Sequence, residues 1–236
     1  MRMARASDFD HYFVDITTGC PYGLPYKAVY HQAVFSGLDQ EAMADFLAHG
    51  YRRNGNCLYC MRCPECAACV PIRIRPEQFR PNRNQKRVWK KNRDVTVGVA
   101  PLIMSKENLA LLDKFLSIRF PEGTSSAQGY YGGFFVSSIS HCFEVRYRIG
   151  DQLLGVAIVD AADQFLNAVY FYFDPAFGHR SPGTLNILYL VDFCRNHKIE
   201  FLYLGYWIES VRAMRYKAAF RPHELYLKER WEQITR

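Results

Sequence analysis

The chain has 236 residues, of which 49% are hydrophobic and 22% charged. Its 17 Phe, 16 Tyr and 3 Trp exclude an intrinsically disordered chain, because so many aromatic side chains need a packed core. No uncharged apolar run approaches the roughly 18 residues of a membrane helix, and the first ten residues hold no apolar stretch typical of a signal peptide. We therefore expect a folded cytoplasmic protein that does not insert into membranes.

The predicted elements fall into two halves. Residues 1–37 are aromatic and rich in turn residues, after which the pattern predicts a helix over 38–49, a short strand over 70–75 and a helix over 84–93. The second half predicts helices over 105–119, 184–196 and 209–217, and strands over 141–148, 153–160, 168–173, 201–204 and 224–227. This order indicates an α+β fold that matches the general acetyltransferase (GNAT) type. We expect a Cys-rich and basic module over 1–95 and an acetyltransferase-like domain over 96–236.

Five of the eight cysteines recur at a spacing of three, namely Cys57, Cys60, Cys63, Cys66 and Cys69. Cys-x-x-Cys spacing turns two thiolates toward one metal ion, and the same spacing occurs in iron–sulfur ligation. Burial as small apolar side chains is the alternative, and it suits Cys142 and Cys194, which lie in apolar segments. A tetrahedral site or a cluster needs four thiolates, so the run has one too many, and Cys20 is a sixth candidate.

The net charge of +7 is concentrated in one block. Nine basic residues and one acid lie between Arg73 and Arg93, which leaves the rest of the chain nearly neutral. Such a block favours a polyanion, and nucleic acid in particular, through counterion release. A solvated helix face without a partner is the alternative.

A loop of acetyltransferase type is predicted at Arg180-Ser181-Pro182-Gly183, between a strand and a helix. In acetyltransferases of this fold an Arg/Gln-x-x-Gly loop opens a helix whose backbone amides hold a pyrophosphate. The position after a strand, more than the motif itself, supports a phosphate site here.

Several segments together resemble the bacterial aspartate/glutamate leucyltransferases, relatives of the eukaryotic arginyl-tRNA–protein transferases. They span about residues 20–225 and include Arg52-Arg53-x-Gly55, Cys63-x-x-Cys66-x-Ala68-Cys69, Val88-x-Lys90-x-Asn92-Arg93-Asp94, Phe173-Asp174-Pro175, Arg180-Ser181-x-Gly183, Tyr203-Leu204-Gly205-Tyr206-Trp207 and Met214-x-Tyr216-Lys217. The resemblance implies an enzyme that moves an amino acid from a charged tRNA onto an N-terminal Asp or Glu, which marks the protein for degradation.

The resemblance also assigns binding residues. It implies that Lys86, Arg87, Lys90, Lys91 and Arg93 contact tRNA phosphates, and that Arg180, Ser181 and Gly183 hold phosphate near the tRNA 3′ end in place of coenzyme A. The cysteines shared with the family are Cys20, Cys63, Cys66 and Cys69, which become the expected ligands of zinc or an iron–sulfur cluster. Cys57 and Cys60 depart from the usual bacterial pattern.

The aminoacyl ester is already activated, so the reaction needs orientation, a proton acceptor and polarisation of the carbonyl, and no protein nucleophile. Asp174 is the expected proton acceptor, with a turn role before Pro175 as the alternative. Tyr172 and Tyr206 are candidate hydroxyl donors, although tyrosines in core strands commonly serve packing. Arg215, Lys217 and Arg221 are the candidate cations for the acceptor's carboxylate, or alternatively partners of a helix dipole.

Leucine is the expected donor amino acid, and arginine is the alternative because Met214-Arg215-Tyr216-Lys217 resembles the arginyl enzymes. An arginyl pocket needs a buried carboxylate; Glu209 unpaired in a cleft would favour arginine, whereas pairing with Arg212 or Lys217 would favour leucine. Two further possibilities are a non-catalytic, metal-bearing tRNA-binding protein and a coenzyme A acetyltransferase. The sequence leaves the oligomeric state open.

Overall fold

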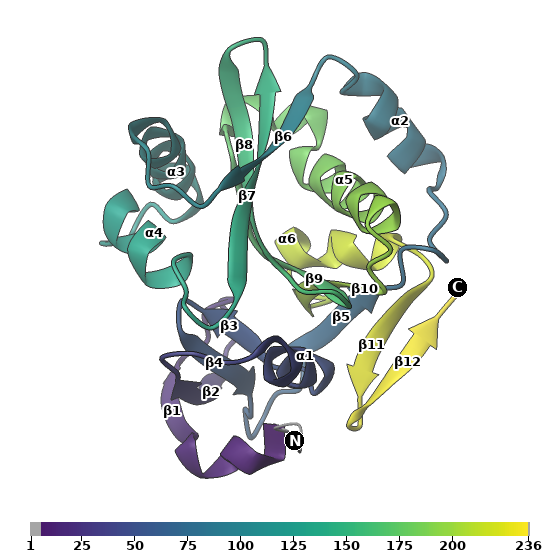
Figure 1. Ribbon diagram of the computed structural model, residues 1–236. Helices are drawn as coiled ribbons and strands as arrows, with labels where there is room; N and C mark the ends of the chain where they lie inside the picture. The colour runs from purple at the N-terminus through teal and green to yellow at the C-terminus, as the bar shows by residue number, and fades with distance from the viewer. Residues whose placement is uncertain (1–5, 236) are drawn as a thin grey trace.

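The computed structural model describes residues 6–235 and contains two sheets, a small one of four strands and a large one of eight (Figure 1). The strand orders are β1-β2-β4-β3 and β12-β11-β5-β10-β9-β8-β7-β6. Residues 1–5, which belong to the stretch searched above for a signal peptide, lie outside the described residues. The expected α+β class is confirmed.

The small sheet is antiparallel and comes from the first 61 residues. Its strands are β1 (Val14–Gly19), β2 (Lys27–Val34), β3 (Arg52–Asn54) and β4 (Cys57–Met61). A 3₁₀ helix, η1 (Ala6–Tyr12), precedes β1, and the helix α1 (Gln40–Ala48) lies between β2 and β3 in the chain. The core of this part forms around Phe46, Leu47 and Leu58, none of which is exposed. The sequence predicted α1 but not the strands, because every residue of β1 is exposed and no apolar alternation marks it.

The large sheet is the central layer of the molecule. Its strands are β5 (Val70–Ile74), β6 (Thr96–Pro101), β7 (His141–Ile149), β8 (Gln152–Ala161), β9 (Phe165–Phe173), β10 (Phe201–Trp207), β11 (His223–Leu227) and β12 (Arg230–Ile234). Central β8 is buried on both faces: Ala157 and Val159 pack in the core that contains α5 (Pro182–Asn196), whereas Val156 and Ile158 pack against α3 (Lys106–Arg119) and α4 (Ala127–Phe134). The helix α2 (Arg83–Lys91) lies beside α5 (Figure 1).

Strands β9 and β10 form the one parallel pair among the described strands, and they diverge. They are paired only from Phe201↔Phe165 to Tyr203↔Asn167. Beyond that point β10 bulges and continues along β5, with Gly205 at φ +81° inside the bulge. We call the opening between β9 after Asn167 and β10 after Tyr203 the fork.

Short helical turns follow the fork strands. The 3₁₀ helix η2 (Pro175–Arg180) links β9 to α5, and α6 (Arg212–Arg215) with η3 (Tyr216–Ala219) follows β10. The single helix expected over 209–217 is therefore two short turns, the second of which extends to Ala219.

The expected boundary near residue 95 does not separate the sheets. Strand β5 comes from the first 95 residues, yet it lies between β11 and β10 of the large sheet. The Cys-rich segment therefore leads directly into a strand of the large sheet. None of the helices within residues 6–235 combines the length and apolar character that crossing a membrane would require.

Candidate active site and nucleic-acid interface

Asp174, the expected proton acceptor, directly follows β9 and is the N-cap residue of η2. Its carboxylate accepts a hydrogen bond from the Ala176 backbone N–H at 3.0 Å and pairs with Lys114 Nζ at 2.7 Å. The side chain is buried, whereas Lys114 is half exposed. The structure thus gives Asp174 the turn role that the sequence allowed as an alternative, and a role in proton transfer would require Lys114 to release it.

The two candidate tyrosines lie in different places. Tyr172 of β9 is fully buried on the α3/α4 face, stacked on Phe135. Tyr206 of β10 lies beyond the bulge and packs edge-on against Tyr59 of β4. Neither hydroxyl has a hydrogen-bond partner within residues 6–235. Burial raises the pKa of both phenols, so each is a neutral hydroxyl.

Two cations meet at the base of the fork. If Gly205 carried a β-carbon, that atom would lie 3.3 Å from Arg52 Nη2 and 3.5 Å from Lys217 Nζ. Lys217 donates to the Tyr206 carbonyl at 2.9 Å, and Arg52 donates to Asn167 Oδ1 at 2.9 Å. Burial, and secondarily the nearby Arg52, lowers the pKa of Lys217 to about 7.

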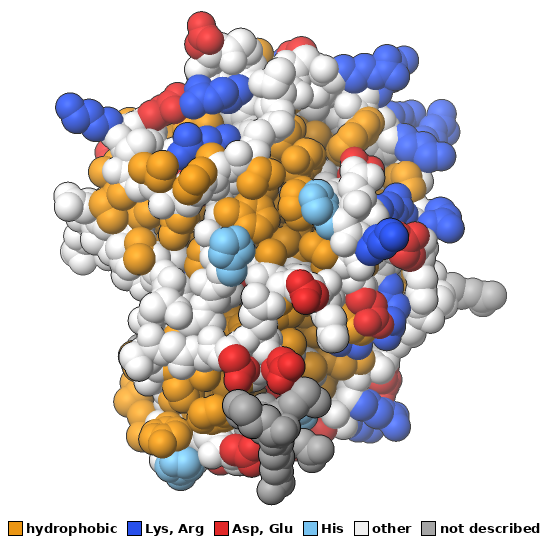
Figure 2. All heavy atoms as spheres, in the orientation of Figure 1, with side chains coloured by type: hydrophobic (Ala, Val, Ile, Leu, Met, Phe, Trp, Pro, Cys, Tyr) orange, Lys and Arg blue, Asp and Glu red, His pale blue; other side chains and the backbone are white. Residues whose placement is uncertain are grey.

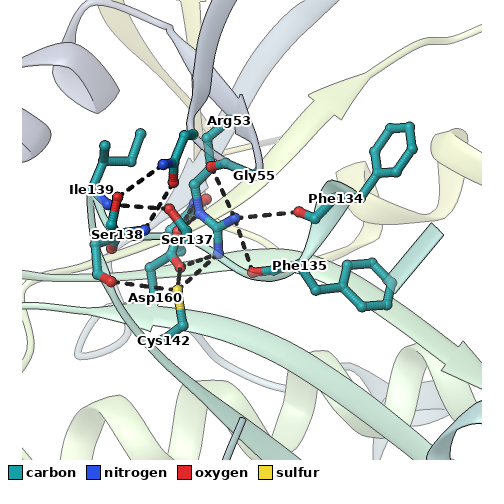
Figure 3. A network of polar contacts seen from close by, with 12 residues as sticks. Arg53, Gly55, Phe134, Phe135, Ser137, Ser138, Ile139, Cys142 and Asp160 are labelled. Carbon is teal, nitrogen blue, oxygen red and sulfur yellow. Dashed lines mark hydrogen bonds and ion pairs between the residues drawn. The ribbon is translucent and has the colours of Figure 1, made fainter. Parts of the chain in front are cut away.

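A buried polar network holds Arg52 in this position. The adjacent Arg53 forms an ion pair with Asp160 of β8 in which neither side chain is exposed, and it also donates to the carbonyls of Phe134 and Phe135 (Figure 3). Asn167 connects the two arginines, since its Nδ2 donates to Asp160 and its Oδ1 accepts from Arg52. Strand β3 of the small sheet is thereby fixed against the strands of the fork.

The other two candidate cations for the acceptor are exposed. Arg215 ends α6, and the Arg221 Nε donates to the Ala218 carbonyl. Of the three cations expected to bind the acceptor, only Lys217 lies at the fork.

The expected phosphate loop lies where β9 leads into α5. Ser181 adopts the left-handed conformation (φ 58°, ψ 53°) before Pro182, and Gly183 follows in the first turn of α5. A β-carbon on Gly183 would lie 3.3 Å from the Tyr216 hydroxyl, so the glycine allows Tyr216 to approach this helix end closely. Arg180, however, forms two hydrogen bonds with Asp94, at 2.8 and 2.9 Å. A phosphate must therefore compete with Asp94 for Arg180.

The basic helix α2 presents exposed cations with no ion-pair partner within residues 6–235. These are Arg83, Lys86, Arg87 and Lys90, followed by Arg93 after the helix. Figure 2 shows Lys and Arg side chains gathered on the side where Figure 1 draws α2. Trp89 is 44% exposed among them, which is the arrangement expected for a base-stacking side chain. Lys91 differs, because it donates to the His179 carbonyl and ties α2 to η2.

The four expected cysteine ligands are neighbours. Burial raises the pKa of the Cys69 thiol to about 12, and Cys63, Cys20 and Cys66 contribute to the same shift. Cys63 Sγ also accepts a hydrogen bond from the Val29 backbone N–H. Four cysteine thiols are the donor set that zinc and iron–sulfur sites use. As the side chains stand, no group of three or more Cys, His, Asp or Glu within residues 6–235 is close enough to hold a metal ion.

The remaining cysteines of the run lie elsewhere. Cys57 and Cys60 are in β4, where Cys60 is directly opposite His31 in the register with β2. Cys60 packs against the core around Phe46, Leu47 and Leu58.

Glu209 lines a cavity of about 400 Å³ beside the end of β10, together with Ala67, Ala68, Val70, Trp207 and Ser210. It forms no ion pair within the described residues, and its side chain is exposed. Because Glu209 does not pair with Arg212 or Lys217, arginine stays an alternative donor amino acid. The exposure argues against it, because an arginyl pocket needs a buried carboxylate.

In the sequence, Arg52 and Gly205 stand out only as parts of family motifs, and no pattern singles out Asn167. The contact between Arg52 and Asn167 joins residues 115 positions apart, so no local pattern predicts it. Adjacent arginines followed by Gly55 in a short strand were the only available signal.

A fork of parallel strands, a helix N-terminus beside it and an unpaired basic helix are the features of an acyltransferase that uses a polyanionic donor. Family models described as "Arginine-tRNA-protein transferase, N terminus" and "C terminus" match residues 18–87 and 107–227. The chain belongs to this family of aminoacyltransferases.

Among curated proteins, the chain is 39% identical over 202 residues to an aspartate/glutamate leucyltransferase of Nitrosococcus oceani, covering 82% of this chain and 85% of the relative. It is 36% identical over 200 residues to one of Methylobacillus flagellatus, covering 84% and 80%. Among solved structures, it resembles the C-terminal DUF2156 domain of an Agrobacterium fabrum protein assigned as a lysylphosphatidylglycerol synthetase. That match has a TM-score of 0.50 at 14% identity and covers 86% of this chain and 66% of the other, so it bears on the fold alone.

Proposed function

We propose that this protein transfers leucine from leucyl-tRNA to proteins whose N-terminal residue is Asp or Glu, and so marks them for degradation in the cytoplasm. The observation that carries the proposal is the fork, which opens beside the N-terminus of α5 and has two cations at its base. The names of the relatives supply the choice of leucine.

The tRNA is proposed to lie along α2, with phosphates contacted by Lys86, Arg87, Lys90 and Arg93. Its 3′ end would reach the first turn of α5 at Ser181 and Gly183, where backbone N–H groups and the helix dipole favour phosphate. The aminoacyl ester would then enter the fork, because β9 beyond Asn167 has backbone groups that β10 leaves unpaired.

The chemistry then needs the acceptor's α-amine to lose a proton and attack the ester carbonyl, so that an amide bond replaces the ester bond and the 3′-terminal hydroxyl of the tRNA leaves with a proton. The neutral hydroxyl of Tyr206, which lacks a partner, is our candidate donor to the developing oxyanion. The proposed proton acceptor is Asp174, once Lys114 releases its carboxylate. A metal on the four cysteines is proposed as a structural group behind this site. Cys69 and Arg52 both contribute to the pKa shift of Tyr22, so this tyrosine connects the cysteine group with Arg52.

One assay tests the function. Peptides beginning with Asp, Glu or Lys are incubated with leucyl- or arginyl-tRNA and read by mass spectrometry. We expect leucine on Asp and Glu peptides only. Arginine on the same peptides would support the alternative donor, and no product together with salt-sensitive tRNA binding would indicate a non-catalytic tRNA-binding protein. Tight binding of coenzyme A would instead support an acetyltransferase.

A further inference from the structure

Arg52 and Lys217 are buried or partly buried cations without an acidic partner within residues 6–235. The other two buried arginines among the described residues each have one: Arg53 pairs with Asp160, and Arg73 pairs with Glu224. Arg52 and Lys217 instead donate hydrogen bonds to uncharged oxygens, on Asn167 and Tyr206. Burial lowers the pKa of Arg52, and the nearby Asp160 offsets only part of that shift because its carboxylate is already paired with Arg53. An anion that binds beside Arg52 and Lys217 therefore gains their attraction.

The geometry suits a small anion that approaches the base of the fork. Arg52 Nη2 and Lys217 Nζ both lie within 3.5 Å of the β-carbon position that Gly205 leaves empty. The Arg52 guanidinium is held in place by Asn167, which Asp160 fixes in turn. A preorganised guanidinium beside an ammonium is an arrangement that binds carboxylates strongly.

We propose that Arg52 and Lys217 form the subsite that binds the side-chain carboxylate of the acceptor's N-terminal Asp or Glu. This inference rests on the proposed function, selects Lys217 from the three cations that the sequence suggested, and adds Arg52 as a specificity-determining residue.

A carboxylate fits this subsite better than a tRNA phosphate does. Arg52 is only 6% exposed, so it offers little surface to a bulky ribose–phosphate backbone, whereas an Asp or Glu side chain carries its carboxylate on a narrow stem of one or two methylenes. The exposed cations of α2 already provide a phosphate surface. The lowered pKa of Lys217 agrees with an incomplete charge balance, which a bound carboxylate would restore.

The test measures binding of short peptides that begin with Asp or Asn, by calorimetry without tRNA. It compares the wild type with Lys217→Met, Lys217→Arg and Arg52→Gln. Lys106→Met, which removes an exposed charge on α3, is the matched control. Loss of a charge-assisted hydrogen bond corresponds to about tenfold or more in affinity. We expect the wild type, Lys217→Arg and Lys106→Met to prefer Asp over Asn by at least that factor, and Lys217→Met and Arg52→Gln to lose most of the preference.

Binding of tRNA by the same variants separates the alternatives. Unchanged tRNA affinity with a lost Asp preference supports the subsite. A retained Asp preference in Lys217→Met, or a loss confined to tRNA affinity, overturns it, and the latter result assigns the cations to phosphate. If Arg52→Gln does not fold, the Asp preference of Lys217→Met alone tests the proposal. Because peptide binding is measured without transfer, a wild type that prefers Asp yet transfers no leucine contradicts the proposed function and leaves the subsite supported.

Discussion

Arg53 of β3 and Asp160 of β8 form an ion pair in which both side chains are completely buried. Asp160 Oδ2 accepts from Arg53 Nε at 2.7 Å and from Asn167 Nδ2 at 3.0 Å, so one carboxylate fixes both the small sheet and the fork. Removal of one partner leaves the other charge buried and unpaired, which is the costly way to break such a pair.

Arg53→Met should therefore lower the free energy of unfolding by about 3–5 kcal/mol. Arg148→Met is the matched control, since Arg148 pairs with Glu107 at the surface and should contribute about 0–1 kcal/mol. Urea unfolding of both variants measures the difference. Equal effects would mean that the Arg53 pair does not hold the small sheet in place.

The basic helix gives a second prediction. Replacing Lys86, Arg87 and Lys90 by Ala should weaken tRNA binding at every salt concentration. The slope of log affinity against log salt should fall by roughly 0.9 for each phosphate contact that is lost. Filter binding between low and moderate salt gives both quantities, with the exposed Lys198 and Lys228, replaced by Ala, as controls for charge alone. An unchanged slope would mean that the cations of α2 do not contact phosphates and are only solvated.

Lys91 is expected to behave differently from its neighbours. Its Nζ donates to the His179 carbonyl at 2.7 Å, so Lys91→Ala should loosen η2 as well as remove a charge.

The sequence predicted most elements of the large sheet because they carry clear local signals. Ser105 caps α3 and accepts a hydrogen bond from the Asn108 N–H, and β8 is a continuous apolar run. The glycine-rich α4 and the exposed β1 lack such signals and were missed. Boundaries of the segment after β10 were also wrong, because two short turns replace one regular helix.

The residues of the site likewise fall into those that a local sequence signal indicates and those that it does not. Lys217 was accessible to sequence reasoning because it lies in a recognisable C-terminal motif. Arg52 was not selected, since its role depends on Asn167 and Gly205, which are distant in sequence and come together only in the fold. The grouping of Cys20 with Cys69 was predicted from the family resemblance together with the Cys-x-x-Cys spacing, and metal binding by this group stays a prediction.

The cysteine group gives a third prediction. Anaerobically purified wild-type protein should contain zinc or iron, and replacing Cys20, Cys63, Cys66 or Cys69 singly by Ser should lower the metal content, because each removes one of four ligands. Cys57→Ser and the buried Cys194→Ser are the controls and should retain it. Elemental analysis measures the content. Metal-free wild-type protein, or equal loss in the controls, would contradict this ligand set.

The last prediction concerns pH and the charge of Lys217. Its pKa is lowered from 10.5 to about 7 by burial and by Arg52, whereas burial raises the pKa values of the nearby Tyr59 and Tyr206, so these phenols stay neutral up to pH 9. As pH falls from 9 to 6, Lys217 gains its proton while the peptide's Asp carboxylate, with a pKa of about 3.9, remains ionised. The preference for an Asp over an Asn peptide should therefore grow as pH falls, and the ratio of the two affinities cancels the titration of the shared α-amine.

The same shift affects stability with a defined sign. Between about pH 7 and 10.5 the unfolded chain holds the Lys217 proton and the folded chain does not, so the free energy of unfolding should rise with pH across this window. Below pH 7 both states hold the proton, so Lys217 adds no pH dependence there and its destabilising effect is fully present. Lys217→Met should lose that contribution and also flatten the pH dependence of Asp preference, while Arg52 maintains a residual preference at pH 9. Urea unfolding and calorimetry at pH 6, 7.5 and 9 measure both effects. A wild-type Asp preference that stays constant over this range would show that Lys217 does not change its charge there, and would leave Arg52 as the pH-independent part of the subsite.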